Sequence, residues 1–354
     1  MIQYSNNKLL TGPALDTSNR TEEIKRGEVG SVFNIITVER AKQYQDLAMQ
    51  SRLRIPLLFG LDVLHGLKTI FPIPLAEAAS FNLDLMRKTA NVAAAETSSL
   101  GIHWTFAPMV DVSRDARWGR SMEGAGEDTW YGSQVAKARI EGFQGSNYDE
   151  KRTVLACAKH FAAYGAAVGG RDYAEADISE HTLQQVYLPP FQAAVEAGVA
   201  TFMNAFNEIN GIPATAHKIL QRDVLKGKWG FKGFVVSDYN SVEELVNHRY
   251  AADKKDAAAK ALNAGLDMEM VSTCYLTYLK ELVQEGKVKE SVLDDAVRRI
   301  LEKKYELGLF EDPFRYCNPE RAARILNAPE VRNASLRMAE RSVYCWRIGN
   351  LCFR

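Results

Sequence analysis

Charged side chains stand at the ends of several short apolar runs in this sequence. Asp238 ends the run GFVVSD, Asp62 ends PLLFGLD, and Lys159 lies near the end of VLACAKHF. A carboxylate at the end of a buried strand needs a partner or a chemical role, because an isolated buried charge is costly. Several hydrogen-bonding groups of this kind, with no metal-ligand spacing and no phosphate-binding loop, favour a ligand rich in hydroxyl groups, such as a sugar.

Each of these residues also has a purely structural interpretation. Asp238 precedes the sequence YNSVEEL, so it is a candidate cap for the next helix. Lys159 and His160 are candidates for a structural ion pair and a hydrogen-bonded core histidine. Glu269 stands between two methionines and is equally a candidate for a buried structural carboxylate. Local sequence leaves both interpretations open for all four residues.

Alternating strand-like and helix-like segments must position these side chains. Short runs that are apolar on both faces are typical of parallel strands buried on both sides. The candidate strands are residues 29–35, 56–63, 103–108, 154–161, 200–206, 233–239 and 265–270. Helical spacing predicts helices over residues 38–52, 83–101, 179–198, 253–265 and 290–310. The pair Pro189 and Pro190 should kink the third of these helices.

Repeated strand–helix units predict an α/β fold with a parallel sheet. Seven such units between residues 29 and 310 fit a (β/α)8 barrel of the TIM type that is one strand short or irregular. A doubly wound sheet is the alternative, but no GxGxxG follows the first strand candidate. Chemistry in a barrel lies at the carboxyl ends of the strands. We therefore expect the polar residues at the strand ends to meet at one mouth of the barrel.

The composition is that of an ordinary globular protein, with 354 residues, 46% of them hydrophobic and 25% charged. Lys and Arg together number 44, as do Asp and Glu, so the balance favours neither nucleic acid nor an anionic membrane as a partner. No apolar run reaches the roughly 18 residues that span a bilayer. The five cysteines are scattered without a CxxC pair, so we expect neither a metal site nor a disulfide framework.

Five motifs in order, between about residues 28 and 310, resemble glycoside hydrolase family 3. They are most similar to those of its bacterial β-glucosidases. The motifs are GLDVLHG with TIFPIPLAEAASFN, FAPMVDVSRDARWGRSMEGAGED, AKHFAAYGAAVGGRDY, MNAFNEINGIPAT and GFVVSDYNSVEEL. The resemblance implies a barrel that binds a sugar at its mouth and needs no cofactor and no metal.

The resemblance assigns roles to individual residues. Asp238, in VSDY, matches the catalytic nucleophile, which would form a covalent glycosyl-enzyme and retain the configuration of the sugar. The residues that match ligands of the sugar at the cleavage point are Asp62, Arg120, Lys159 and His160, with Arg171 of GGRDY as a looser match. Charge-assisted hydrogen bonds of this kind orient a sugar and can strengthen in the transition state.

Two further substrate-site candidates carry less defined roles. Glu269 matches a strand end of the family, and the resemblance implies no specific task for it. Phe206 departs from the family pattern, in which a Tyr hydroxyl often lies near the nucleophile. Phe keeps the ring and removes the hydrogen-bond donor, so we expect a somewhat higher pKa for Asp238.

A retaining glycosidase needs a second carboxyl group about 5–5.5 Å from the first. The resemblance implies that this acid is a Glu on an α/β domain that follows the barrel in β-glucosidases. The single-domain N-acetylglucosaminidase branch instead uses an Asp–His pair after KHF, and the loop KHFAAYGAAVGGRDY lacks its pattern. We therefore expect residues 1–312 to form the catalytic barrel and residues 313–343 to be a linker toward a second domain that this chain lacks.

The last eleven residues depart from the family pattern. Residues 344–354 read YCWRIGNLCFR, where the family has an apolar LLKN…LLP pattern. Codons permitted for these residues read LLENRESLLP in another frame. We therefore expect a frameshift near codon 344 and an out-of-frame tail over residues 344–354.

The expected activity is release of terminal β-linked glucose from the non-reducing ends of β-glucosides or β-linked oligosaccharides, in a chain impaired by the missing acid. The alternatives are a non-catalytic sugar-binding fragment and a β-xylosidase. A homo-oligomer, in which another chain supplies the acid, is a further alternative. The start MIQYSNNKLLTGP is not a signal peptide, which predicts a cytoplasmic protein as given, or a periplasmic or secreted one if the natural start lies upstream.

Overall fold

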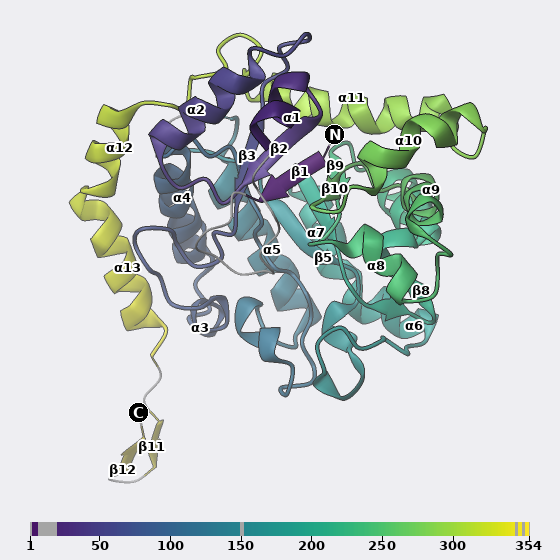
Figure 1. The fold of residues 1–354 in the computed structure, drawn as a ribbon. Coiled ribbons are helices and arrows are strands. Elements are labelled where there is room, and N and C mark those ends of the chain that lie inside the picture. Colours follow the sequence, from purple (N-terminus) through teal and green to yellow (C-terminus); the bar gives the residue numbers. More distant parts are fainter. Residues whose placement is uncertain (1, 6–19, 149–151, 344–345, 349–350, 354) are drawn as a thin grey trace.

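The computed structural model describes residues 2–5, 20–148, 152–343, 346–348 and 351–353. Eight short parallel-paired strands of the described part lie at its centre, and helices surround them (Figure 1). These strands are β1 (Ile2–Ser5), β2 (Val29–Phe33), β3 (Leu58–Leu61), β4 (Trp104–Thr105), β5 (Cys157–Phe161), β6 (Thr201–Asn204), β9 (Phe234–Val236) and β10 (Glu269–Met270). The fold is of the mixed α/β class, as predicted.

The central strands are hydrogen-bonded in two parallel groups. One group follows the order β10-β1-β2-β3-β4 and the other the order β5-β6-β9. Single parallel bridges join the groups at both edges: Trp104 of β4 pairs with Leu155, and Val236 of β9 pairs with Met268. Since Leu155 and Met268 lie just ahead of β5 and β10, each group borders the other on both sides.

All seven segments predicted as strands contain one of these strands. The eighth, β1, was missed because its four residues IQYS are too few and too polar to form an apolar run. It lies between β10 and β2 and pairs in parallel with both. The seven predicted strands were therefore one short, and the additional strand is β1 at residues 2–5.

Helices α2 (Val38–Ala48), α4 (Leu83–Ser99), α9 (Lys254–Ala264) and α11 (Glu290–Glu306) confirm four of the predictions. Side chains cap several of them, as Asp253 does by accepting from the backbone of Asp256 at the start of α9. The predicted helix over 179–198 is broken into α6 (Glu180–Thr182), a π-helical turn (Leu183–Tyr187) and α7 (Pro189–Glu196). The break comes at the proline pair because proline has no N–H for the helical ladder.

The remaining helices are α1 (Arg20–Arg26), α3 (Pro74–Ala79), α5 (Thr129–Gln144), α8 (Ser241–Asn247), α10 (Cys274–Gln284), α12 (Pro319–Leu326) and α13 (Pro329–Arg341), with a π-helical segment over Ile219–Lys228. Figure 1 shows α12 and α13 beside α4 at one edge of the molecule. The residues they bury include Ala322, Val331, Ala334 and Met338. The segment expected to be a linker thus contains two helices.

Large side chains from the central strands pack against one another between the strands. They form one buried cluster that includes Phe33, Trp104, Phe106, Met203, Phe234 and Met268. A second, larger cluster lies between the strands and the surrounding helices. Because apolar rings and thioethers fill the middle of the strand array, a ligand bound at the strands would lie beyond the strand ends.

Two loops at the carboxyl ends of neighbouring strands approach closely. Gly165, in the loop after β5, lies so near the chain after β4 that an added Cβ would be 2.2 Å from the carbonyl oxygen of Val112. Only glycine fits such a contact. This approach holds the segment Tyr164–Tyr173 beside the segment that carries Trp118 and Arg120.

Among the described residues, no helix is long and apolar enough to cross a bilayer.

Candidate active site

A cavity of about 510 Å³ lies at the carboxyl ends of the strands, which is an ordinary size for a small-ligand site. Its lining comes from almost every strand end and from two loops. The lining residues are Phe33, Asn34, Asp62, Leu64, Phe106, Arg120, Glu123, Lys159, His160, Asp172, Tyr173, Met203, Phe206, Asp238, Tyr239 and Met270. Six of the eight residues predicted for the site are among them.

Asp238 lies two residues beyond the end of β9 and is 8% exposed. The backbone N–H of Tyr239 donates to its Oδ1 at 2.6 Å, whereas Oδ2 has no hydrogen-bond partner among the described residues. Burial raises the pKa of this carboxyl to about 6, and the nearby charges of Arg120 and Lys159 oppose that rise. The carboxylate therefore holds one unengaged oxygen at the cavity.

The alternative role of Asp238 as a helix cap is not what the structure shows. Helix α8 begins at Ser241, and its N-cap residue is Asn240, which makes no side-chain cap bond. Within the described part of the chain, the side chain of Asp238 accepts only from the N–H of the next residue, ahead of the helix. The Asp is thus free to serve the cavity.

Lys159 and Asp62 form an ion pair across two strand ends. Nζ of Lys159 lies 2.6 Å from Oδ1 of Asp62, with the lysine side chain 4% exposed and the aspartate side chain 51% exposed. Burial is the largest influence on Lys159 and opposes its charge, but Asp62 and Glu123 together raise the pKa of the ammonium above its usual value. The pair presents a buried donor and an open acceptor to the cavity, which suits neighbouring hydroxyl groups.

Arg120 reaches the cavity from the loop that follows β4. Its guanidinium bonds both oxygens of Glu123, at 2.8 and 3.0 Å, and lies over the ring of Tyr164 at 5.6 Å. A paired and stacked guanidinium is held in one orientation. No described residue bonds Nη1 of Arg120, which leaves its N–H groups to a ligand, and the charge of Arg120 acts on Asp238.

His160 is completely buried and is oriented by Asp111. The backbone N–H of His160 donates to Oδ2 of Asp111 at 2.9 Å, and Nδ1 of the ring lies 2.9 Å from the same oxygen. Burial lowers the pKa of His160 well below 6.5, so the ring is neutral. Burial likewise raises the pKa of Asp111 to about 7. The other ring nitrogen, Nε2, lies 3.6 Å from Oδ2 of Asp238.

Comparison with known protein families shows to which family this chain belongs. Residues 7–303 match the family model described as "Glycosyl hydrolase family 3 N terminal domain". The chain belongs to glycosyl hydrolase family 3. The resemblance stated from its motifs is therefore confirmed.

Family 3 relatives of this chain carry two kinds of name. The "Periplasmic beta-glucosidase" of Salmonella typhimurium is 46% identical over 312 residues, which are 88% of this chain and 41% of the relative. A "Beta-xylosidase" of Formosa agariphila is 35% identical over 357 residues, with 94% of this chain and 49% of the relative covered. The chain therefore spans less than half the length of these curated relatives.

A solved family 3 structure has the same fold over nearly the whole chain. The β-glucosidase from Listeria innocua in complex with isofagomine matches with a TM-score of 0.92 and 42% identity, covering 98% of this chain and 49% of that one. The same enzyme in complex with glucose matches with a TM-score of 0.90 and 40% identity over the same shares of the two chains.

Two of the predicted site residues, Glu269 and Arg171, do not line the cavity. Glu269 is buried, and its two oxygens accept from the backbone N–H groups of Cys274 and Tyr275, at 2.8 and 2.7 Å, at the start of α10. Burial raises the pKa of Glu269 to about 7, against the effect of these amides. Arg171 is exposed and does not line the cavity, although its neighbours Asp172 and Tyr173 do. Glu269 therefore serves helix α10, not the pocket.

Several lining residues were not singled out from the sequence. Glu123 orients Arg120, and Asp172 accepts from the indole N–H of Trp118 at 2.9 Å. Tyr173 and Tyr239 place aromatic rings on the cavity wall. Their positions in the sequence could have indicated them, since each of these four residues lies within three residues of a predicted site residue.

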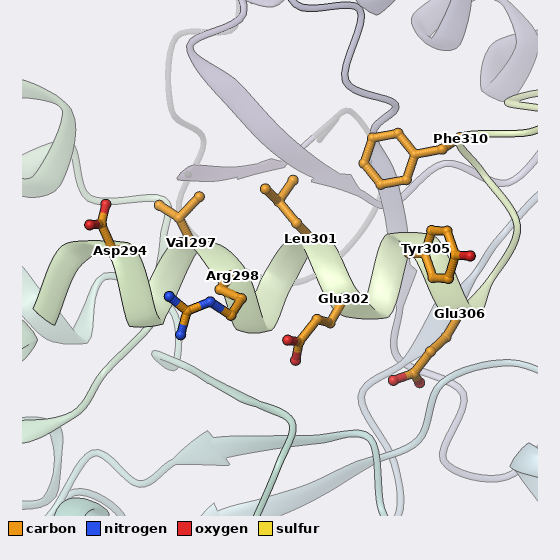
Figure 2. Close-up of a pocket in the computed structure, with 8 residues that line it drawn as sticks. All are labelled: Asp294, Val297, Arg298, Leu301, Glu302, Tyr305, Glu306 and Phe310. Atoms are coloured by element: carbon orange, nitrogen blue, oxygen red, sulfur yellow. The ribbon is translucent and has the colours of Figure 1, made fainter. Parts of the chain in front are cut away.

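A larger hollow, of about 610 Å³, lies along the outer side of α11 (Figure 2). Figure 2 shows Val297, Leu301 and Phe310 on one side of the helix and the charged Arg298, Glu302 and Glu306 on the other. Its carboxylates do not point toward a common centre, so this surface lacks the convergent groups that chemistry needs.

Among the described residues, no group of three or more His, Cys, Asp and Glu side chains is arranged to hold a metal ion.

Proposed function

We propose that this chain is the sugar-binding and nucleophile-bearing part of a retaining β-glucosidase. The observation that carries the proposal is the buried Asp238, with one unengaged oxygen at a cavity ringed by Asp62, Arg120, Lys159 and His160. Membership of family 3 supports it, as do relatives named as β-glucosidases at 40–46% identity. The substrate would be a β-linked glucose at the non-reducing end.

Asp238 is the group that would attack the sugar. Its pKa of about 6 leaves the carboxylate ionised at neutral pH, and Arg120 and Lys159 favour that ionised form. Oδ2 would bond the anomeric carbon as the bond to the leaving oxygen breaks, giving a covalent glycosyl-enzyme. Water would then displace Asp238 from the opposite face, so that two inversions retain the configuration.

The polar residues around Asp238 would bind the hydroxyl groups of the same sugar. Asp62 offers an acceptor, Lys159 and Arg120 offer donors, and each is held by a short ion pair with a neighbour. Because these side chains are already ordered by their ion pairs, a sugar would not need to organise them on binding.

Apart from Asp238, the described lining of the cavity offers no carboxyl group that is free to protonate the leaving group. The other carboxylates of the cavity are engaged: Asp62 with Lys159, Glu123 with Arg120 and Asp172 with Trp118. We therefore propose that the acid comes from a further domain, toward which residues 313–343 lead. The out-of-frame origin of residues 344–354 belongs to this proposal and is tested by the coding DNA, in which codons unrelated to LLENRESLLP would contradict it.

The barrel architecture is also part of the proposal. Parallel neighbours on both sides of each of the eight strands, with single bridges at the two junctions, support a closed (β/α)8 barrel. In such a barrel the strand ends converge on one mouth, which is the arrangement that Asp62, Lys159 and Asp238 require.

A trapping experiment tests the function without the acid. The probe is a dinitrophenyl β-glucoside in which fluorine replaces the hydroxyl next to the anomeric carbon, here called the aryl fluorosugar. Its leaving group departs as the phenolate and needs no proton, and the fluorine slows release of the adduct. Intact-protein mass spectrometry should show one glycosyl adduct, and peptide analysis should place it on Asp238. Asp238→Asn should not be labelled, whereas Asp84→Asn, at an exposed position, should be labelled normally.

The outcomes separate the alternatives. A chain that binds glucosides but forms no adduct is a sugar-binding fragment, and the proposed nucleophile is then wrong. Faster trapping by the corresponding xyloside than by the glucoside would favour the β-xylosidase alternative, which the Formosa relative suggests.

A further inference from the structure

Tyr173 and Phe206 form a pair of aromatic rings at the edge of the cavity. Their centroids are 4.5 Å apart and their planes are inclined by 38°. Phe206 is buried, whereas Tyr173 is 49% exposed, and both line the cavity. One ring is thus anchored in the wall, and the other extends that wall toward solvent.

Neighbouring residues fix the position of the exposed Tyr173 ring. Tyr164 packs edge-on against Tyr173 at 6.4 Å and also contacts Phe206 at 5.9 Å. Asp172, the residue before Tyr173, accepts from the buried indole N–H of Trp118. Tyr173 itself has a φ of 65°, in the left-handed region that non-glycine residues rarely occupy. Such a conformation persists only where the surroundings impose it, so the ring position is built into the loop.

The cavity has a polar buried end and an open edge to which the exposed residues Tyr173, Asp62 and Asp172 contribute. Lys159, His160 and Asp238 are each less than 9% exposed, so the groups suited to sugar hydroxyls lie at the buried end. A sugar held there by the residues around Asp238 must direct its leaving group toward the open edge, because that group has to depart. Tyr173 is the exposed aromatic ring at that edge, and burial, with a smaller effect of Glu244, raises the pKa of its phenol to about 12, so the ring is uncharged.

We propose that the Tyr173–Phe206 pair forms the leaving-group subsite and selects aglycones that present a flat apolar face, such as an aryl ring or the face of a second sugar. The proposal rests on the proposed function for the position of the sugar. A ring contact of this kind accounts for about a threefold to tenfold preference in binding.

Equilibrium binding tests the subsite independently of catalysis. The probes are methyl and phenyl β-thioglucosides, which share the sugar, resist hydrolysis and differ only in the aglycone. Wild type should bind the phenyl compound about threefold to tenfold more tightly than the methyl compound. Tyr173→Ala should abolish that difference by weakening only the phenyl compound, and Tyr173→Phe should keep it. Tyr305→Ala, which removes an exposed ring on α11, is the matched control and should behave as wild type.

Trapping gives a second readout. The aryl fluorosugar should label Tyr173→Ala several-fold more slowly than wild type, whereas the same fluorosugar with fluoride as its leaving group should label both at equal rates. An equal loss with both probes, or no loss with either, overturns the subsite. If neither probe labels wild type but the phenyl preference depends on Tyr173, the nucleophile assignment fails and the subsite stands.

Discussion

Nε2 of His160 lies 3.6 Å from Oδ2 of Asp238, and neither atom has a hydrogen-bond partner among the described residues. The opposite side of the imidazole is held by Asp111, which does not itself line the cavity. Asp111, His160 and Asp238 therefore form a row in which the first residue sets the direction of the second. A substrate hydroxyl that enters beside Asp238 would therefore lie next to Nε2 of His160, which Asp111 holds in position through Nδ1.

Removal of Asp111 should therefore slow the reaction without removing a substrate contact. Asp111→Ala frees the ring of His160 and should reduce the rate of trapping by the aryl fluorosugar by about tenfold to a hundredfold, because small misplacements are costly in catalysis. Asp111→Asn keeps an acceptor oxygen of the same size and should recover much of the rate. Asp115→Asn alters a surface ion pair in the same loop and serves as the control. Trapping by Asp111→Ala at the wild-type rate would exclude the positioning role.

The rate of trapping should rise with pH and level off above pH of about 6. Only the ionised Asp238 attacks, and burial raises its pKa from 3.8 to about 6. Lys159→Met removes a positive charge that lowers this pKa, so the inflection should move to higher pH. Lys137→Met, which removes a surface partner of Glu196, should leave the profile unchanged. A profile that is flat from pH 4 to pH 8 would refute the assignment.

The same raised pKa predicts a cost to stability. A carboxyl whose folded pKa is raised contributes stability that is fully present below 3.8 and is lost as pH rises through about 6. Asp238→Asn should therefore be more stable than wild type at pH 7, by about 1–3 kcal/mol. Urea unfolding at pH 7 and pH 4 measures the difference, which should shrink at the lower pH. A destabilised Asp238→Asn at pH 7 would show that the buried charge is better compensated than its surroundings indicate.

Phe206→Tyr should lower the pKa of Asp238. The unengaged Oδ2 has no donor among the described residues, and Phe206 lines the same cavity without a polar atom. A tyrosine hydroxyl that donates to the carboxylate favours its ionised form. The inflection of the trapping profile should therefore move to lower pH, with a modest change in the plateau rate. An unchanged rate and an unchanged profile would disprove this interpretation of Phe206.

Glu269→Gln should affect stability and leave trapping intact. The two oxygens of Glu269 each accept a backbone N–H at the start of α10, and glutamine has only one acceptor. A buried N–H left without a partner costs about 1–3 kcal/mol. Urea unfolding should show this loss, whereas the rate of labelling in the folded protein should match that of wild type. Slower labelling at full stability would return Glu269 to the sugar site.

Much of this architecture could be predicted because its signals are local. Apolar runs of strand length and helical spacing each report on a few consecutive residues, and seven strands and the helices α2, α4, α9 and α11 follow from them, whereas α5 and α10 were not predicted. The residue types at the strand ends likewise named Asp62, Lys159, His160 and Asp238 as candidates. Strand β1 was not predicted, because four residues of mixed polarity show too little periodicity. Its pairing with β10 and β2 identifies it as a strand.

The amino-acid sequence determined the family, the order of the elements and the chemical types of the groups at the strand ends. The tertiary structure decided which of those groups share a cavity. Asp238 and Glu269 both stand at strand ends after apolar runs, yet one carboxylate faces the pocket and the other turns to the amides of α10. The direction of such a side chain depends on the loop that follows it and on the chain that packs against it. Glu269 bonds amides five and six residues further on, whereas Asp238 lies near Arg120 and Lys159, which are distant in sequence. The same non-local packing brings Tyr173 beside Phe206 and Asp111 behind His160.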